Sequence, residues 1–186
     1  MKILVLVGDY FEDTELLATI DVWRRHDEIV DVISMMGRKV VTSKNGFPIE
    51  VTETFEKIEN HLEMYDFLFI PGGPGSFRIL NRDPRVDQTI KWFVEHDKLV
   101  TAICAAPHLI GRLGYLKDKK YTVHPGFEDQ IIGGTYLREE GVVEDGNFIT
   151  GKSMYYSIPF ALKVIEHFYG EIEAKILEKS MMGEGK

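Results

Sequence analysis

The chain has 186 residues, of which 44% are hydrophobic and 28% are charged, a composition typical of a globular protein. This length predicts a single domain over residues 1–186, with room for a substantial core. The formal net charge is −8, and the sequence has no basic stripe that would offset it. Both observations argue against nucleic acid or an anionic membrane surface as a partner.

Two features of the chain bear on its location in the cell. The apolar run near the N-terminus soon meets acidic residues, and no segment approaches the roughly 20 apolar residues of a membrane span. Cys104 is the only cysteine, so no internal disulfide can form. We therefore expect a cytoplasmic protein that carries a reduced thiol and does not enter a membrane.

The first part of the chain alternates short apolar runs with amphipathic stretches. Continuous apolar runs predict buried strands, whereas Leu16, Leu17, Ile20 and Trp23 form one stripe of a helix. Lys44-Asn45-Gly46 is typical of a hairpin turn. In chain order we expect a strand at 2–7, a helix at 11–25, a strand at 29–34, hairpin strands at 40–42 and 47–51, a helix at 55–62 and a strand at 66–70.

The second part of the chain continues this alternation. Asp145-Gly146 indicates another hairpin turn. The expected elements are helices at 84–96 and 105–113 with a strand at 99–103 between them, hairpin strands at 142–144 and 148–150, and closing helices at 158–169 and 172–179. The pattern predicts an α/β fold, a mostly parallel sheet with helices on both faces. Ligands of such folds bind beyond the carboxyl ends of the strands.

Three segments follow predicted strands and are expected to meet at that edge of the sheet. They are residues 8–15, residues 71–75 and the turn at Cys104. Cys104 ends an apolar run, and Pro107 fits the first turn of the helix that follows. A thiol near a helix N-terminus is expected to have a pKa below that of free cysteine, and its thiolate is a nucleophile. The alternative is a small buried core residue.

Backbone amides offer a second role at this edge. Gly72 and Gly73 lie in a rigid Pro-Gly-Gly-Pro-Gly turn, and Ala105 follows the cysteine. Their N–H groups are candidates to stabilise an oxyanion or to bind an anionic group. The alternative is a simple tight turn after a strand.

A carboxyl group and a histidine complete the candidate set. Glu12, Asp13 and Glu15 crowd the start of the first helix, where acids also stabilise the helix dipole. Glu15 lies beside the apolar stripe, and a carboxyl held near a thiolate would have a raised pKa. His124 is expected to end a short strand before a Pro-Gly turn and to face a cleft. A metal site of Cys104, His108 and a Glu is conceivable but disfavoured, since structural zinc sites use more cysteines.

Taken together, these motifs resemble the DJ-1/ThiJ/PfpI superfamily. The matching segments are Ala102-Ile103-Cys104-Ala105-Ala106-Pro107, Pro71-Gly72-Gly73, Phe11-Glu12-Asp13-Thr14-Glu15 and Val123-His124-Pro125-Gly126. The resemblance implies a flavodoxin-like three-layer sandwich, a homodimer or higher homo-oligomer, and a reactive cysteine at a nucleophile elbow.

The resemblance also assigns residues. It implies that Cys104 is the nucleophile, that Glu15 is the carboxyl hydrogen-bonded to the sulfur, with Glu12 as second choice, and that His124 is the nearby histidine. Gly73 and Ala105 would supply the oxyanion-type amides. No cofactor and no metal are implied.

This sequence differs from the motifs of related subgroups, and the differences disfavour a peptidase or an amidotransferase activity. PfpI-type peptidases carry a histidine directly after the cysteine, where this chain has Ala105. Class I glutamine amidotransferases carry glycines around the cysteine and a late His-x-Glu pair, and this chain has neither. Many DJ-1-like proteins have a Gly-Pro-Gly stretch where this chain has Lys152-Ser153-Met154-Tyr155-Tyr156, so we expect a reshaped cleft.

The resemblance implies a cysteine-dependent enzyme that acts on reactive carbonyls, as a glutathione-independent glyoxalase or a deglycase. Its substrate would be a small aldehyde or a glycated protein. One alternative is a redox-sensing stress-response protein, since an accessible thiolate oxidises readily. Others are an intracellular cysteine peptidase or amidase, and a chaperone-like helper without catalysis.

Overall fold

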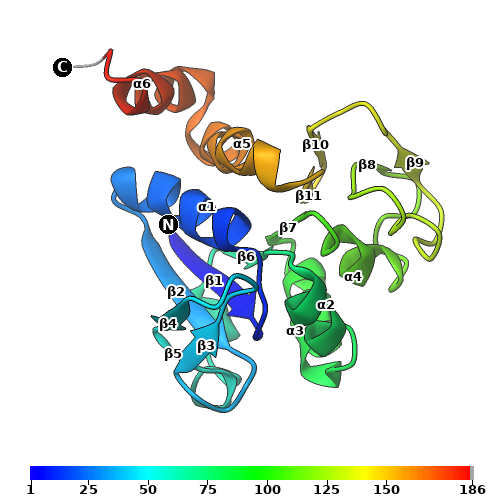
Figure 1. Cartoon of the computed structure of the whole chain (residues 1–186). Coiled ribbons are helices and arrows are strands. Elements are labelled where there is room, and N and C mark those ends of the chain that lie inside the picture. The colour runs from blue at the N-terminus through cyan, green and yellow to red at the C-terminus, as the bar shows by residue number, and fades with distance from the viewer. Residues whose placement is uncertain (185–186) are drawn as a thin grey trace.

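A computed structural model describes residues 1–184. At its centre is a seven-stranded sheet in the order β10-β11-β7-β6-β1-β2-β5, in which every neighbouring pair is parallel except β10 and β11 (Figure 1). The strands are β1 (Lys2–Val7), β2 (Ile29–Ser34), β5 (Glu53–Thr54), β6 (Phe67–Ile70), β7 (Leu99–Ile103), β10 (Val142–Asp145) and β11 (Phe148–Gly151). Two small sheets pair β3 (Val40–Thr42) with β4 (Pro48–Glu50) and β8 (Lys120–Tyr121) with β9 (Thr135–Tyr136).

Helices cover both faces of the sheet, which confirms the predicted three-layer α/β sandwich (Figure 1). One layer holds α1 (Asp13–Arg25), α5 (Ser157–Tyr169) and α6 (Glu171–Met181). The other holds α2 (Pro74–Leu80), α3 (Pro84–Glu95) and α4 (Pro107–Gly111). Short 3-10 helices are η1 (Phe55–Lys57), η2 (Leu62–Met64) and η3 (Met154–Tyr156). No helix within residues 1–184 has the length and apolar character needed to cross a membrane.

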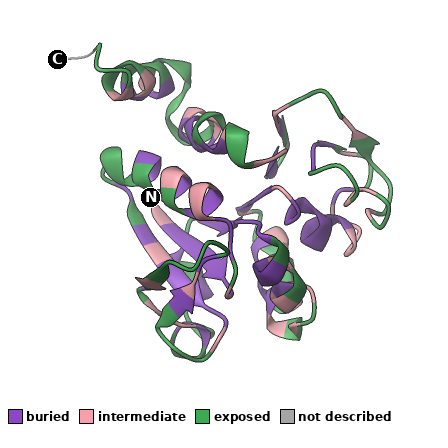
Figure 2. Cartoon of the chain, viewed as in Figure 1, coloured by how far each residue is buried: buried purple, intermediate pink, exposed green. Residues whose placement is uncertain are grey.

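The strand side chains alternate between two cores, because successive residues of a strand point to opposite faces of the sheet. Ile3, Val5 and Val7 of β1 join the core under α1 and α5, whereas Leu4 and Leu6 join the core under α3 and α4. Both faces of the central strands are therefore buried (Figure 2). This explains why these strands read as continuous apolar runs in the sequence.

Trp23 anchors α1 on its face of the sheet. Its ring meets Phe67 and Phe69 of β6 edge-on, with ring centroids 5.2 and 5.1 Å apart, and its indole N–H donates to the carbonyl of Ala161 in α5 at 3.1 Å. Two layers are thus joined at one fully buried side chain. This packing holds α1, which carries Glu15 in its first turn, against the sheet.

Several expected elements differ in the structure. In place of the helix predicted at 55–62, the structure has the two short helices η1 and η2. The three apolar residues of this segment, Phe55, Ile58 and Leu62, are nevertheless buried. Eight residues nucleate a helix poorly, and Asn60 favours a turn. The sequence did not predict β5, α2 or β9, and the short strand expected to end at His124 is β8, which ends at Tyr121. The helix predicted at 105–113 is the shorter α4.

Candidate active site

Cys104 lies at a sharp turn between β7 and α4. Its φ angle is +64°, in the left-handed region that residues other than glycine rarely adopt. Two hydrogen bonds hold the turn: its N–H donates to the carbonyl of Gly151 at 2.8 Å, and its carbonyl accepts from the N–H of His124 at 2.8 Å. Strain of this kind concentrates at functional sites. The half-buried thiol is thereby presented above the carboxyl ends of the strands.

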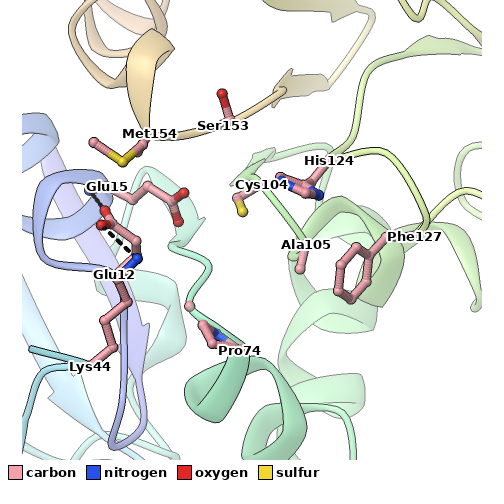
Figure 3. A pocket seen from close by; sticks show the side chains of 11 residues that line it. Glu12, Glu15, Lys44, Pro74, Cys104, Ala105, His124, Phe127, Ser153 and Met154 are labelled. Carbon is pink, nitrogen blue, oxygen red and sulfur yellow. Dashed lines mark hydrogen bonds and ion pairs between the residues drawn. The ribbon is translucent and has the colours of Figure 1, made fainter.

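The first turn of α1 brings Glu15 to the sulfur (Figure 3). Glu12 is the N-cap of the helix and accepts from the N–H of Glu15 at 2.9 Å. The Glu15 side chain is 1% exposed, and its Oε2 accepts from the N–H of Gly72 at 3.0 Å. Its carboxyl lies beside the thiol of Cys104, and each group shifts the pKa of the other. The two side chains form a buried pair of acids.

Burial raises the pKa of both groups in this pair. Desolvation, with a contribution from the charge of Glu12, raises the pKa of Glu15 to about 7. Desolvation, then the charge of Glu15 and its hydrogen bond, raise the pKa of the Cys104 thiol, against a lowering by the N–H groups of Ala105 and Gly73. The N–H groups at the turn lower the thiol pKa as expected, but burial and the neighbouring Glu15 oppose them and raise it. Two neighbouring buried acids do not both ionise at neutral pH and share at least one proton.

Gly72 and Gly73 are required by the close approach of chains at this point. A Cβ on Gly72 would lie 2.6 Å from Oε2 of Glu15 and 2.8 Å from Cβ of Cys104. A Cβ on Gly73, whose φ is +101°, would lie 2.4 Å from the backbone nitrogen of Glu12. The N–H of Gly72 is occupied by Glu15, so Gly72 does not serve as the expected anion donor. Gly73 and Ala105 remain the candidates, since both N–H groups act on the sulfur.

A pocket of about 310 Å³ opens over the thiol. Its walls include Glu12, Glu15, Gly73, Cys104, Ala105 and His124, so most of the expected site residues meet in one place (Figure 3). His124 is exposed at the wall, and its Nδ1 donates to the carbonyl of Pro125 at 3.0 Å. We predicted that His124 ends a short strand, but it lies in an irregular segment after β8. The strand is shorter than predicted because the pairing of β8 with β9 stops at Tyr121.

Further residues line the pocket, and of these the sequence analysis did not single out Lys44 or Phe127. Lys44, from the hairpin of β3 and β4, places its Nζ 3.3 Å from Oε1 of Glu12. Phe127 follows His124 by three residues and adds an apolar wall. Ser153 and Met154 come from the segment that replaces Gly-Pro-Gly, and they line the pocket as that replacement suggested. For Lys44 no local signal existed, because the hairpin meets α1 only in the folded chain.

His108 does not join the thiol in a ligand cluster. Its ring is buried, and its Nδ1 faces the carbonyl of Phe127 at 3.1 Å. Over the described part of the chain, no group of three or more His, Cys, Asp or Glu side chains is arranged to hold a metal ion.

Comparisons with known proteins find relatives and similar folds over most of the chain. The model of the DJ-1/PfpI family matches residues 1–167. A deglycase of Pyrococcus horikoshii is 32% identical over 153 residues, which cover 82% of this chain and 90% of the relative. A DJ-1 superfamily protein of Salmonella typhimurium superimposes with a TM-score of 0.89 at 26% identity, over 100% of this chain and 99% of that one. DJ-1 of Toxoplasma gondii, described as oxidized, gives 0.88 at 28% identity and 97% of each chain.

Proposed function

This chain belongs to the DJ-1/PfpI family, and from that premise we propose that it is a cysteine-dependent enzyme acting on reactive carbonyls, of the glyoxalase or deglycase type. The observation that carries the proposal is the pairing of the Cys104 thiol with the Glu15 carboxyl at the base of the pocket. The deglycase name of the Pyrococcus horikoshii relative supports the substrate class.

Glu15 is suited to act as the general base for the thiol. A base works best when its pKa lies near the working pH, and that of Glu15 is raised to about 7. As the sulfur attacks an aldehyde carbon, the S–C bond forms and Glu15 takes the thiol proton. The carbonyl oxygen gains negative charge beside the N–H groups of Ala105 and Gly73, and it is protonated to give a hemithioacetal.

For methylglyoxal, the remaining steps balance with one water. Removal of the proton on the former aldehyde carbon gives an enediol, and protonation of the adjacent carbon gives a thioester. Water then cleaves the S–C bond, releasing lactate and the free thiol. Glu15 and His124 are the candidate carriers of these protons, since both line the pocket with Cys104.

Replacing the nucleophile tests this activity. We expect Cys104→Ser to reduce lactate formation from methylglyoxal to the background rate, because a serine hydroxyl held by the same carboxyl is a far weaker nucleophile. Lactate is measured enzymatically with the variant shown to be folded by circular dichroism. A variant that keeps wild-type turnover would refute the role of Cys104.

A second candidate function is redox sensing by the same thiol. Cys104 is half-buried and reachable from the pocket, and Glu15 is placed to donate a hydrogen bond to an oxidised sulfur. The Toxoplasma gondii DJ-1 structure, described as oxidized, favours this reading.

Intact mass after mild peroxide treatment tests the redox role. We expect a stoichiometric gain of two oxygens that peptide mapping places on Cys104, because a sulfinate is stabilised by the protonated carboxyl. Cys104→Ala serves as the control and should gain none. Oxidation spread over the seven methionines, with Cys104 unmodified, would contradict the redox role.

A further inference from the structure

His108 is a buried histidine that the mechanism proposed above does not use. It lies in α4, four residues after Cys104, and is 5% exposed. Its Nδ1 lies 3.1 Å from the carbonyl of Phe127. A carbonyl only accepts, so Nδ1 carries a proton and donates this hydrogen bond. His108 therefore joins α4 to the segment that carries Phe127.

The other ring nitrogen of His108 shows that an imidazole at this place has a cost. Nε2 is buried, and within residues 1–184 it has no hydrogen-bond partner. The ring meets that of Phe77 edge-on, with centroids 5.3 Å apart, so the surroundings of His108 include apolar groups. An aliphatic side chain of similar size would fill this place without burying an unpaired polar atom. The hydrogen bond from Nδ1 is what such a side chain would not supply.

The segment held by His108 forms one wall of the active-site pocket. Residues 122–134, between β8 and β9, are irregular, so neither a helix nor a strand ladder fixes His124 and Phe127. Both residues line the pocket with Cys104 (Figure 3). The N–H of His124 donates to the carbonyl of Cys104 at 2.8 Å, and the N–H of Phe127 donates to the carbonyl of His124 at 3.1 Å. With the bond from His108, both ends of residues 124–127 are tied to the turn and the helix that carry the nucleophile.

The aromatic rings of this wall pack on one another. The rings of His124 and Phe127 meet at 81°, with centroids 6.0 Å apart, and those of Phe127 and Phe77 meet at 83°, with centroids 5.0 Å apart. A shift of the Phe127 backbone would therefore move the ring on which His124 packs. Through Phe127, the bond from His108 restrains the place of the His124 ring in the pocket wall.

We propose that His108 is a positioning residue for the reaction of Cys104. Its Nδ1–H holds the carbonyl of Phe127, and this bond keeps the His124 ring in its place beside the thiol. The inference rests on the proposed function, in which His124 is a carrier of protons. It requires an N–H donor at the place of Nδ1, whereas the rest of the imidazole ring can be replaced.

The first experiment tests the wall without turnover. His108→Asn keeps an N–H donor at the place of Nδ1, whereas His108→Leu has no donor there. We measure the nuclear Overhauser effect between the ring protons of His124 and Phe127, and expect it to be kept in His108→Asn and lost in His108→Leu. His96→Leu is the matched control. It removes a hydrogen bond from the same ring atom to the carbonyl of Trp92, 2.8 Å away at the end of α3, and should leave the effect unchanged.

The second experiment measures the consequence for turnover. We expect His108→Leu to lower kcat for lactate formation from methylglyoxal by about tenfold or more, with a smaller change in KM, because a proton carrier is misplaced. His108→Asn should restore kcat. The rate of alkylation of Cys104 by iodoacetamide should be the same in both variants and the wild type, since the pair with Glu15 is kept. A role in stability alone would lower the alkylation and turnover of both variants together.

Several results would overturn the inference. They are an Overhauser effect that persists in His108→Leu, a kcat that is unchanged in this variant, and a loss in His108→Asn equal to that in His108→Leu. The wild type alone also tests the bond, should His108→Leu not fold. Long-range 1H–15N spectra that place the proton of the neutral His108 ring on Nε2 would overturn it.

Failure of the proposed function gives a different result. The wild type would then show no Cys104-dependent turnover, while the Overhauser effect between His124 and Phe127 still depended on the donor at position 108. That outcome would refute the carbonyl chemistry and leave the hold of His108 on the pocket wall standing.

Discussion

At the scale of single residues, the candidate site depends on one shared proton. Glu15 and Cys104 lie in contact, and burial raises the pKa of each. The pair therefore loses its first proton near pH 7 and its second at a much higher pH, as expected of coupled acids. The thiol is activated when Glu15 can accept its proton, and not by the helix N-terminus alone.

The pH dependence of alkylation checks this coupling. We expect the rate of Cys104 with iodoacetamide to rise through about pH 7, as the pair loses its first proton, and to rise again at higher pH. Glu15→Gln cannot accept the proton, so the step near neutrality should disappear and leave a single titration.

Glu12→Gln is the matched control for this measurement. The charge of Glu12 helps to raise the pKa of Glu15, so this variant should keep the first step and move it to lower pH. Identical profiles for the wild type and Glu15→Gln would show that the two acids are not coupled.

At the scale of elements, three connections meet above the ends of β1, β6 and β7. The first turn of α1 supplies Glu15, the turn before α2 supplies Gly72 and Gly73, and the turn before α4 supplies Cys104. The N–H of Glu12 donates to the carbonyl of Gly72 at 3.2 Å, which joins the first two connections. The glycines are there because no side chain fits between these backbones.

Gly73→Ala tests how closely these connections must approach. The new Cβ would meet the backbone of Glu12, and the residue would keep a positive φ, so we expect a loss of about 2 kcal/mol or more in the free energy of unfolding and slower alkylation of Cys104. Urea denaturation and the iodoacetamide rate measure the two effects.

Gly170→Ala supplies the comparison for Gly73→Ala. Gly170 has φ 90° and ψ 165°, close to the 101° and 129° of Gly73, but nothing lies within 4 Å of its Cβ position. It should show the cost of the backbone conformation alone and leave alkylation unchanged. Equal losses in both variants would mean that the contact with Glu12 contributes nothing.

At the scale of the whole molecule, a second cluster of charges joins elements that are far apart in the sequence. Glu28, after α1, accepts from the ammonium group of Met1 and pairs with His26 at 2.9 Å. His26 reaches Glu173 of α6 at 3.4 Å and packs against the ring of Tyr169 at the end of α5. This cluster ties the first strand to both closing helices.

Glu28→Gln tests this cluster. The pKa of Glu28 lies below its ordinary value because its hydrogen bonds to the N-terminus, His26 and Tyr169 outweigh desolvation. Its stabilising contribution is therefore present above the ordinary carboxyl pKa and is lost as the pH falls through the lowered value. We expect the untagged variant to lose about 1–3 kcal/mol of unfolding free energy at pH 7, with the difference shrinking in acid.

Glu144→Gln removes a more exposed pair, with His167, and should cost less than about 1 kcal/mol. Chemical denaturation at several pH values measures both variants. A Glu28→Gln loss that did not change between pH 7 and acid would contradict the assigned charge interaction.

Much of the fold follows from local sequence patterns. Strands buried on both faces are continuous apolar runs, so β1 and β7 appear in the sequence at the bounds they have in the structure. The bounds of β2 also match, although Ile29 is exposed and Asp31 interrupts its apolar run. The predicted β3–β4 and β10–β11 hairpins are confirmed, because each turn carries its own glycine. The seven-residue α2 was missed because its glycines and prolines are typical of a loop, although Pro74 fits a first helical turn.

The sequence by itself determined the α/β architecture and singled out Cys104, because hydrophobic periodicity and a strand-to-helix turn are properties of neighbouring residues. Only the tertiary structure decided that Glu15 accepts a hydrogen bond from the N–H of Gly72 and that Lys44 pairs with Glu12. It also decided that burial raises the pKa of the thiol. Hydrogen bonding and desolvation at the site depend on groups brought together from distant parts of the chain. These distances and burials arise only when the sheet and its two helical layers are assembled.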